Sequence, residues 1–433
     1  MGSTEMNARQ EKGRQISALS RVSRKDGVWH VPSQSGGETY IVDPNPDGPR
    51  CTCPDYELRG GKCKHIFAVE YTIERETQPD GNTTVTETVT VKATRVTYKQ
   101  DWPAYNAAQI NEKAKFQALL HDLCRGITEP PPRAGAGRKP IPLADMVFSV
   151  ACKVFSTVSG RRFSCDLAEA HAKGYLSRLP HYNTVFSYLE NPTLVPILRG
   201  LIIESSLPLK AIETDFAVDS SGFSTSRFVR WYDQKYGRVV KKHDWVKVHI
   251  MTGVKTNIVT AVEIKDKDAN DSPLLPPLVN TTKQGFAIRD VSADKAYIGQ
   301  ENLETIANAG GTGYIAFKKN ATGGIGGLYE KAYHYFCLNR DEFLKHYHLR
   351  SNAESTFSMI KAKFGDSIRS KTDVAMVNES LCKILCHNLA CVISAMYELN
   401  INPVFWGDDA RAGAKPADTA PDLDEMMSML SWI

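Results

Sequence analysis

The sequence predicts an α/β domain preceded by a helical region and by a small metal-binding module. From residue 208 to about 400, apolar strand patterns alternate with helical patterns, and acids lie at the ends of two strands. Residues 141–207 have helical periodicity throughout. Within residues 1–80, three cysteines and a histidine recur at the spacing of a zinc site.

Length and composition are consistent with this organisation. The 433 residues are enough for two or three domains, and a hydrophobic content of 42% supports a full core. The net charge is +4, yet residues 406–433 carry six acids against two cations. We therefore expect an acidic, flexible tail from residue 401 and a modestly basic body. Such a body suits a nucleic-acid partner, although many cytosolic proteins share it.

The sequence also indicates a cytoplasmic protein. It contains no run of 18 apolar residues, so we expect no membrane partner. The N-terminus is polar and soon charged, unlike a signal peptide. The ten cysteines fit a reducing compartment.

The metal-binding module consists of Cys51, Cys53, Cys63 and His65. A Cys-x-Cys pair followed by Cys-x-His supplies three thiolates and one imidazole, the donors that tetrahedral Zn²⁺ prefers. The alternatives are four residues with unrelated roles, or a redox pair. The redox alternative is weak because thioredoxin-like sites use Cys-x-x-Cys.

The surroundings of the four ligands support a finger. Residues 28–42 are typical of a hairpin with a Gly-Gly turn, and a helical run follows His65, which we expect in the first helical turn. The pattern resembles the SWIM-type zinc finger at all four ligand positions. That resemblance implies contact with DNA or protein. Flanking cations favour contact with phosphates, namely Arg50, Arg59, Lys62 and Lys64.

Residues 81–140 connect the finger to the rest of the chain. The alternation of Thr and Val over residues 82–98 predicts an extra strand or an extended linker. Residues 105–124 have a helical pattern. Residues 129–140 are too rich in Pro and Gly for regular structure, and serve as an interdomain linker or as an arm in a DNA minor groove.

The helical region 141–207 contains four expected helices. The first begins near Pro142, and the others cover residues 163–173, 181–190 and 193–206. The third is either the second helix of a helix-turn-helix or a structural helix. In the second case it packs three apolar side chains, those of Val185, Phe186 and Leu189.

The α/β domain, residues 208–400, alternates strands with helices. The first strand is expected to end at Asp219, and a later one carries Asp294. A helix over residues 374–399 contains Cys and His residues at a spacing that could suggest a metal site, but core packing explains these residues better. The other expected strands cover residues 245–252, 256–264 and 313–317. The other expected helices are one that begins at Asp271 and those over residues 301–309 and 347–363. A loop follows the strand 313–317 and contains Lys318, Lys319 and the Gly-rich residues 323–327.

Three acids form the candidate catalytic set. Asp219 and Asp294 follow apolar strand patterns, and Glu354 belongs to a helix. Oxygen ligands that converge from separate elements are what a two-metal phosphoryl-transfer site requires. Asp215 and Asp290 lie four residues before the two aspartates and are retained as second choices.

The helix with Glu354 has a charged face. At about 100° per residue, Tyr347, Arg350 and Lys361 lie within an arc of about 60° around Glu354. Such a face suits a metal ion flanked by phosphates. An ordinary salt-bridged surface is the alternative, because Arg350 and Glu354 form an i,i+4 pair.

These residues resemble a known family. The pattern Tyr347-x2-Arg350-x3-Glu354-x6-Lys361 matches the signature of DDE insertion-sequence transposases. The segments Val-Asp219-Ser-Ser-Gly and Ala-Asp294-Lys-Ala-Tyr match the two aspartate boxes of that family, and they favour these aspartates over the second choices. The resemblance covers about residues 140–400 and implies a ribonuclease-H-like fold.

The resemblance also implies roles for the residues. Asp219, Asp294 and Glu354 would hold Mg²⁺ or Mn²⁺ for cutting and joining DNA. The cations and the tyrosine would contact DNA, a set formed by Tyr347, Arg350, Lys361, Lys318 and Lys319. The partners would be the double-stranded DNA of transposon ends and target, bound by a homodimer in a prokaryotic, nucleoid-associated setting. A non-catalytic DNA-binding regulator and a nuclease that cuts without joining are the rival functions.

Overall fold

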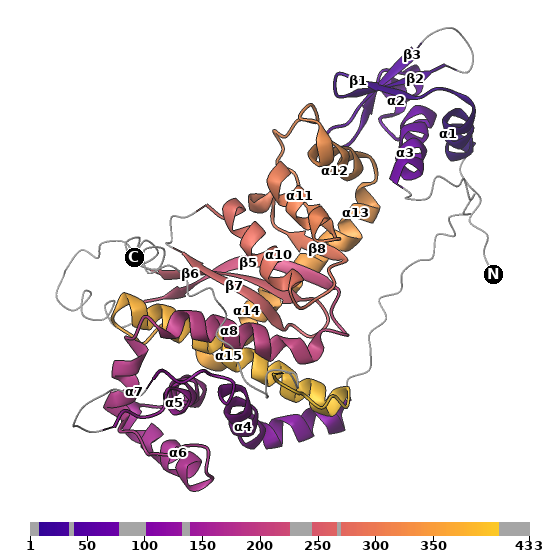
Figure 1. The fold of residues 1–433 in the computed structure, drawn as a ribbon. Helices are drawn as coiled ribbons and strands as arrows, with labels where there is room; N and C mark the ends of the chain where they lie inside the picture. Colours follow the sequence, from indigo (N-terminus) through magenta and orange to yellow (C-terminus); the bar gives the residue numbers. More distant parts are fainter. Residues whose placement is uncertain are drawn as a thin grey trace, which may run out of the picture. The chain divides into compact units, whose positions relative to one another are not determined.

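The computed structural model divides the chain into two compact units (Figure 1). The first contains residues 1–99, 293–304 and 313–348, and the second contains 100–292, 305–312 and 349–433. The structure describes residues 8–33, 39–77, 101–131, 139–225, 245–265 and 270–406. Residues 82–98, 132–138 and 407–433, for which a strand or linker, an arm or linker and an acidic tail are expected, lie outside this described part.

A four-stranded antiparallel sheet forms one side of the first unit. Its strands follow each other in the order β1 (Ser23–Lys25), β2 (Val28–Pro32), β3 (Thr39–Asp43) and β4 (Arg50–Cys51). The hairpin predicted over residues 28–42 is therefore confirmed. Alternate residues of β2 and β3 are buried, as expected for a sheet with one face on a core.

Helices cover this sheet and extend the unit. Helix α1 (Ala8–Leu19) packs closely on α3 (Lys64–Thr77), since a Cβ added to Gly13 would lie 2.5 Å from Phe67 Cβ. The short α2 (Pro54–Arg59) precedes α3. The unit also contains α12 (Gly327–Leu338) and α13 (Arg340–Tyr347), and the sequence patterns revealed neither of these helices nor α1 and α2.

The finger and the segment around α12 and α13 share one hydrophobic core. Its buried residues include Trp29 and Val42 from the finger together with Phe317, Phe336 and Phe343. Polar contacts follow the same interface: Trp29 Nε1 donates to His334 Nδ1 at 3.3 Å, Tyr333 Oη donates to the Pro44 carbonyl at 3.2 Å, and Arg24 pairs with Glu330. The finger is thus built into a larger folded unit.

The second sheet has the strand order β7-β6-β5-β8-β9. Strand β5 pairs antiparallel with β6, and β6 with β7. The expectation that the first strand ends at Asp219 is wrong, because β5 continues five residues further and pairs up to Ser224. The five strands are β5 (Asp215–Ser224), β6 (Trp245–Gly253), β7 (Val259–Lys265), β8 (Asp290–Ala293) and β9 (Thr312–Ile315).

The helices of the second unit agree with the predicted ones within a few residues. Helix α15 is the longest, and it contacts α4, α5 and α8 as well as the sheet (Figure 1). Helix α7 buries Val185 and Leu189, whereas Phe186 is 40% exposed. The helices are α4 (Trp102–Cys124), α5 (Leu143–Ser156), α6 (Gly160–Ala172), α7 (Tyr182–Leu189), α8 (Leu194–Ser206), α10 (Leu275–Lys283), α14 (Ser351–Phe364) and α15 (Asp373–Glu398), with α11 (Gln300–Asn308) divided between the units.

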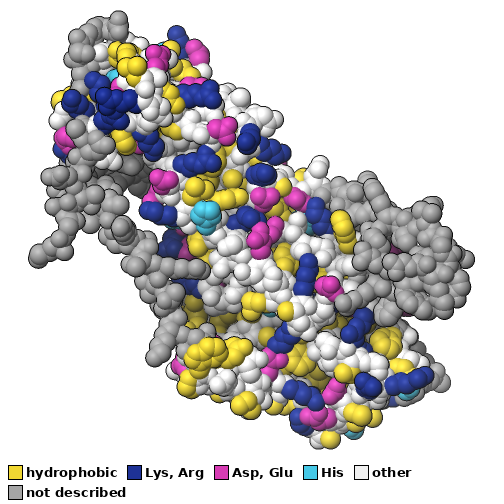
Figure 2. Space-filling model, turned by 180° about the vertical axis from the view of Figure 1, so that it is seen from behind, with side chains coloured by type: hydrophobic (Ala, Val, Ile, Leu, Met, Phe, Trp, Pro, Cys, Tyr) yellow, Lys and Arg dark blue, Asp and Glu magenta, His cyan; other side chains and the backbone are white. Residues whose placement is uncertain are grey.

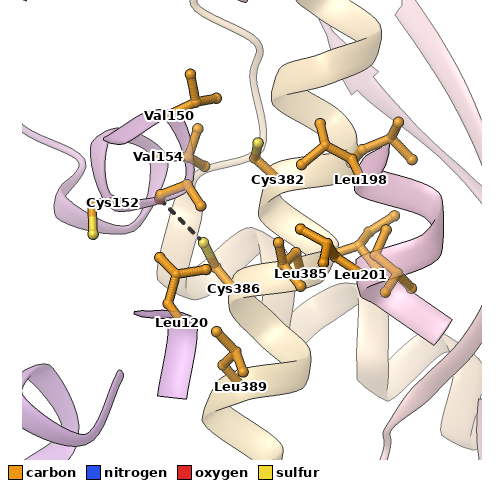
Figure 3. Close-up of a cluster of buried hydrophobic side chains, with 14 of the residues drawn as sticks. Leu120, Val150, Cys152, Val154, Leu198, Leu201, Cys382, Leu385, Cys386 and Leu389 are labelled. Atoms are coloured by element: carbon orange, nitrogen blue, oxygen red, sulfur yellow. Dashed lines mark hydrogen bonds between the residues drawn. The ribbon is translucent and has the colours of Figure 1, made fainter. Parts of the chain in front are cut away.

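The cysteines of α15 are core residues, as the packing interpretation expects. Figure 3 shows Cys382 and Cys386 among aliphatic side chains of α4, α5 and α8. The Cys386 thiol donates to the Ala151 carbonyl at 3.4 Å. By length and hydropathy α15 is a candidate membrane span, but 78% of its most apolar window is buried inside the protein, as in a core helix.

Candidate metal and nucleic-acid sites

The four predicted zinc ligands are delivered by three elements. Cys51 ends β4, Cys53 is the N-cap residue of α2, and Cys63 immediately precedes α3. His65 is the second residue of α3, in its first turn as predicted. Gly60 ends α2 with a left-handed φ of 64°, which a glycine adopts without strain, and so the chain can turn back toward Cys63.

The ligand atoms have the mutual distances of a tetrahedral zinc site. All four lie within 4.8 Å of one another, and His65 Nδ1 lies 3.9 Å from the sulfurs of both Cys51 and Cys63. With Zn–S bonds of 2.3 Å, tetrahedral geometry requires ligand atoms about 3.8 Å apart. All four side chains are buried. The residues therefore fit Zn²⁺.

The buried thiols of the cluster differ in the direction of their pKa shifts. A hydrogen bond with Cys51 lowers the pKa of Cys63 to about 4, whereas burial raises the pKa of Cys53. Zinc binds thiolates, so a bound ion would supply the charge that lets the remaining thiols ionise inside the protein.

Two of the four cations around the finger already have acidic partners. Arg59 pairs with Asp55 at 3.6 Å, and Lys62 pairs with Glu70 at 2.8 Å. For Arg50 no side-chain ion pair is found among the described residues, and the same holds for Lys64. Figure 2 shows Lys and Arg side chains gathered on one face of this unit.

In the second unit, Asp219 faces α14. Because side chains alternate along a strand, Asp219, Ser221 and Phe223 lie on one face of β5, which contacts α14. Arg350, the N-cap residue of α14, reaches two acids: its Nη2 lies 2.7 Å from Glu354 Oε1 and its Nη1 lies 3.7 Å from Asp219 Oδ2. The structure thus brings Asp219, Arg350 and Glu354 together.

Lys361 extends the same face. Its Nζ donates to Ser221 Oγ at 2.6 Å and lies 5.7 Å from the ring centre of Phe223. Burial lowers the pKa of the Lys361 amine. Arg350 and Glu354 are therefore in contact as predicted, while Lys361 lies seven residues after Glu354 on α14 and contacts β5 near Asp219.

Tyr347 departs from this prediction. The chain from Tyr347 to Lys361 is not one helix: α13 ends at Tyr347, a 3-10 turn covers His348–Arg350, and α14 begins at Ser351. The arc that assumes a single helix is therefore wrong for Tyr347. This ring belongs to the first unit, where it stacks on Phe343 with ring centres 6.2 Å apart.

Asp294 immediately follows β8, as predicted. It is the N-cap residue of a short 3-10 turn, and its carbonyl accepts from Tyr297 N at 2.9 Å. Its side chain is partly exposed, and within the described part of the chain it makes no hydrogen bond or ion pair. Strand β8 is the neighbour of β5 in the sheet.

The second-choice aspartates have cationic neighbours. Arg289 holds Asp215 with two nitrogens, of which Nε donates at 2.8 Å, so both carboxylate oxygens of Asp215 are engaged. Asp290 is 6% exposed and lies 3.9 Å from Arg289 Nε. Asp219 also has a cationic neighbour, Arg350, but only Asp215 has both carboxylate oxygens held by one guanidinium.

Sequence reasoning missed two residues beside this face, Ser221 and Lys383. The period of two from Asp219 could have revealed Ser221. Lys383 on α15 is buried, and it donates to the carbonyls of Gly365 at 2.9 Å and Ser367 at 2.8 Å, just after α14. Burial lowers its pKa to about 8. The signal was present, because Lys383 interrupts the apolar run of the helix predicted over residues 374–399, but no local pattern identifies the carbonyls that it contacts.

Lys318 and Lys319 are exposed in the loop that follows β9. Lys319 also lines a cavity of about 480 Å³ between the glycine-rich loop and the finger strands, together with Asp26 and Asp43. Their exposure is compatible with contact to a polyanion.

The acids around α14 suit a hard divalent ion. Asp219 and Glu354 offer carboxylate oxygens, the ligands that Mg²⁺ and Mn²⁺ prefer, and both already turn toward one cation, Arg350. Asp294 follows β8, the neighbouring strand, but it belongs to the first unit, and among the described residues its carboxylate does not form one cluster with those of Asp219 and Glu354. Asp219 and Glu354 are therefore the two donors here that suit such an ion.

Comparison with known protein families gives two matches. Residues 211–389 match the family model described as Transposase DDE domain, and residues 40–74 match the one described as SWIM zinc finger. The two matched ranges include Asp219, Asp294, Glu354 and all four zinc ligands. No curated protein and no solved structure matched the chain.

Proposed function

Because the chain carries a transposase DDE domain and a SWIM zinc finger, we propose that it cuts transposon ends and joins them to target DNA. The DDE domain indicates a metal-dependent, DNA-cleaving protein of the transposase type. The observation that carries the proposal is the face on which Arg350 holds Asp219 and Glu354 while Lys361 lies beside them. Binding alone requires none of these acids.

The proposal includes a ribonuclease-H-like fold for residues 208–400. Antiparallel β5, β6 and β7 on one side of the sheet, with β8 and β9 on the other, support it. It also includes a DNA-binding role for the helical region 141–207 and a zinc finger within residues 1–80.

In this mechanism Asp219, Asp294 and Glu354 would hold Mg²⁺ or Mn²⁺. The ion would supply activation of a water or 3′-hydroxyl and stabilisation of the leaving oxygen. Arg350 and Lys361 neutralise phosphate oxygens of the DNA end. Lys361 is suited to this role because Ser221 and Phe223 hold its amine in place.

The partners in the proposal are double-stranded transposon ends and target DNA, bound by a homodimer in a prokaryotic, nucleoid-associated cytoplasm. Tyr347 contacts the DNA end by stacking or hydrogen bonding. Lys318 and Lys319 add exposed charge for phosphate contacts.

Single substitutions of the acids test the proposal. Asp219→Asn, Asp294→Asn and Glu354→Gln should each lower Mg²⁺-dependent nicking of plasmid DNA by about 10³-fold or more, because a ligand of the reacting metal is lost. Binding of duplex DNA should persist. Near wild-type nicking by any of the three would remove that residue from the site. DNA binding by the wild type without Mg²⁺-dependent nicking would favour the regulator.

A nuclease that cuts without joining remains the second candidate, since the same acids would serve it. Strand transfer with pre-cut DNA ends, taken from the sequences that flank the gene, separates the two functions. Joined products that disappear in Glu354→Gln support transposition. Cleavage without joined products supports the nuclease.

A further inference from the structure

One guanidinium group pairs with two of the three candidate metal-binding acids. Arg350 pairs with Glu354 at 2.7 Å and with Asp219 at 3.7 Å. The side chains of Arg350 and Asp219 are 22% and 19% exposed, whereas that of Glu354 is 55% exposed, so only the Arg350–Asp219 pair is partly buried on both sides. Partly buried pairs are screened less by salt than surface pairs. A fixed positive charge therefore lies beside the carboxylates to which the proposed function assigns a metal ion.

This placement sets up a competition. A divalent ion and a guanidinium beside the same two carboxylates repel each other, and at a separation of about 4–5 Å this repulsion is large compared with thermal energy. The ion binds most tightly when Arg350 has left the acids. A DNA phosphate offers Arg350 an alternative partner of equal charge and matching fork geometry.

We propose that Arg350 couples metal binding to DNA binding. In the free protein it occupies Asp219 and Glu354 and weakens the binding of a divalent ion. On DNA it moves to a phosphate and releases both acids. Because coupling is reciprocal, DNA tightens the binding of the ion and the ion tightens the binding of DNA. The inference rests on the proposed function, since it takes Asp219 and Glu354 as metal ligands.

The other cations nearby do not share this position. Lys361 donates to Ser221 rather than to an acid of the candidate site. Lys363 belongs to the same helix but pairs with Glu112 of α4. Removal of Lys363 thus takes the same charge from α14 without touching Asp219 or Glu354, which makes it a matched control.

The test is the affinity of the zinc-loaded full chain for Mn²⁺ without DNA, measured by electron paramagnetic resonance of free Mn²⁺. Arg350→Gln should bind Mn²⁺ about tenfold more tightly than the wild type or better, because the competing charge is gone. Lys363→Gln should bind as the wild type does. Asp219→Asn, made in the wild-type and Arg350→Gln backgrounds, should abolish the measured binding and so identifies the site.

A second arm adds a short DNA duplex in excess, with the Mn²⁺ bound by the duplex alone subtracted. The affinity of the wild type should then rise toward that of Arg350→Gln, whose own affinity should change little. Arg350→Lys keeps the positive charge but loses the two-nitrogen guanidinium geometry, so its Mn²⁺ affinity should lie between those of the wild type and Arg350→Gln. If Arg350→Gln fails to fold, the comparison of Arg350→Lys with the wild type tests the inference.

Two outcomes would overturn the inference, and only the second of them would also overturn the proposed function. Asp219-dependent binding that is equally tight in the wild type and Arg350→Gln would overturn the coupling and leave the proposed function intact. Absence of any Asp219-dependent Mn²⁺ binding in both proteins would overturn the proposed function as well.

Discussion

At the scale of single residues, the candidate DDE site combines acids with cations on one helix face. Arg350 and Lys361 both belong to that face, yet their contacts differ: Arg350 pairs with carboxylates, whereas Lys361 hydrogen-bonds Ser221. Asp215, which a strand pattern cannot distinguish from Asp219, is neutralised by Arg289. The chemistry of each residue therefore depends on a partner far away in the sequence.

Removal of Lys361 should weaken binding of duplex DNA and flatten its salt dependence. Each lost phosphate contact lowers the slope of log K against log salt by about one unit. Fluorescence anisotropy at several salt concentrations measures this slope for Lys361→Ala. Lys363→Ala is the control, because Lys363 pairs with Glu112 on another helix. Equal slopes for the two variants would show that Lys361 does not contact DNA.

At the scale of elements, hydrogen bonds join the segment that follows α14 to β5 and α15. Ser224 N donates to the Asp366 carbonyl, Ile368 N donates to the Ser224 carbonyl, and Lys383 donates to the two carbonyls that flank Asp366. The ammonium of Lys383 also lies 4.9 Å from the ring centre of Phe223. Lys383 thus joins the strand that carries Asp219 to the helix that carries Glu354.

Lys383→Met should lower the free energy of unfolding by about 1–3 kcal/mol, because two buried carbonyls lose their donor. The loss should depend on pH. Burial lowers the pKa of Lys383 from 10.5 to about 8, so between these values the unfolded chain binds more protons than the folded chain. The stability that Lys383 contributes therefore rises with pH across this window.

Urea unfolding at pH 7 and pH 10 measures this dependence. The difference between wild type and Lys383→Met should be larger at pH 10 than at pH 7. Lys383→Arg keeps the hydrogen-bond donors but stays charged at both pH values, so its free energy of unfolding should not show the rise between pH 7 and pH 10 that Lys383 gives the wild type. An identical difference at both pH values would show that Lys383 does not titrate in this window.

At the scale of the whole molecule, the zinc site belongs to a core that includes part of the segment between β9 and α14. Cys51, Cys53 and Cys63 share this core with Phe336 and Phe343. The second unit has a separate core built around α15. Loss of zinc should therefore lower the local stability of α12 and α13, and it should affect the second unit much less.

Cys63→Ser should lower the zinc content and raise amide hydrogen exchange in both the finger and helices α12 and α13, since binding of structural zinc contributes directly to folding. Helix α15 should keep its protection. Cys165→Ser is the matched control, because Cys165 is an exposed thiol outside the zinc cluster. Unchanged exchange in α12 and α13 after zinc loss would show that the finger supports only itself.

The sequence by itself determined the Cys/His cluster and most helices, and from it we predict the three acids. These follow from local rules: ligand spacing within a short loop, alternation along a strand and the period of a helix. Only the structure decided that α13 ends at Tyr347 while Arg350 caps α14, that Arg289 neutralises Asp215 and that Lys383 is buried beside Phe223. It also placed the finger and helices α12 and α13 in one core. Such contacts join residues far apart in the chain, and they depend on packing that no local pattern encodes.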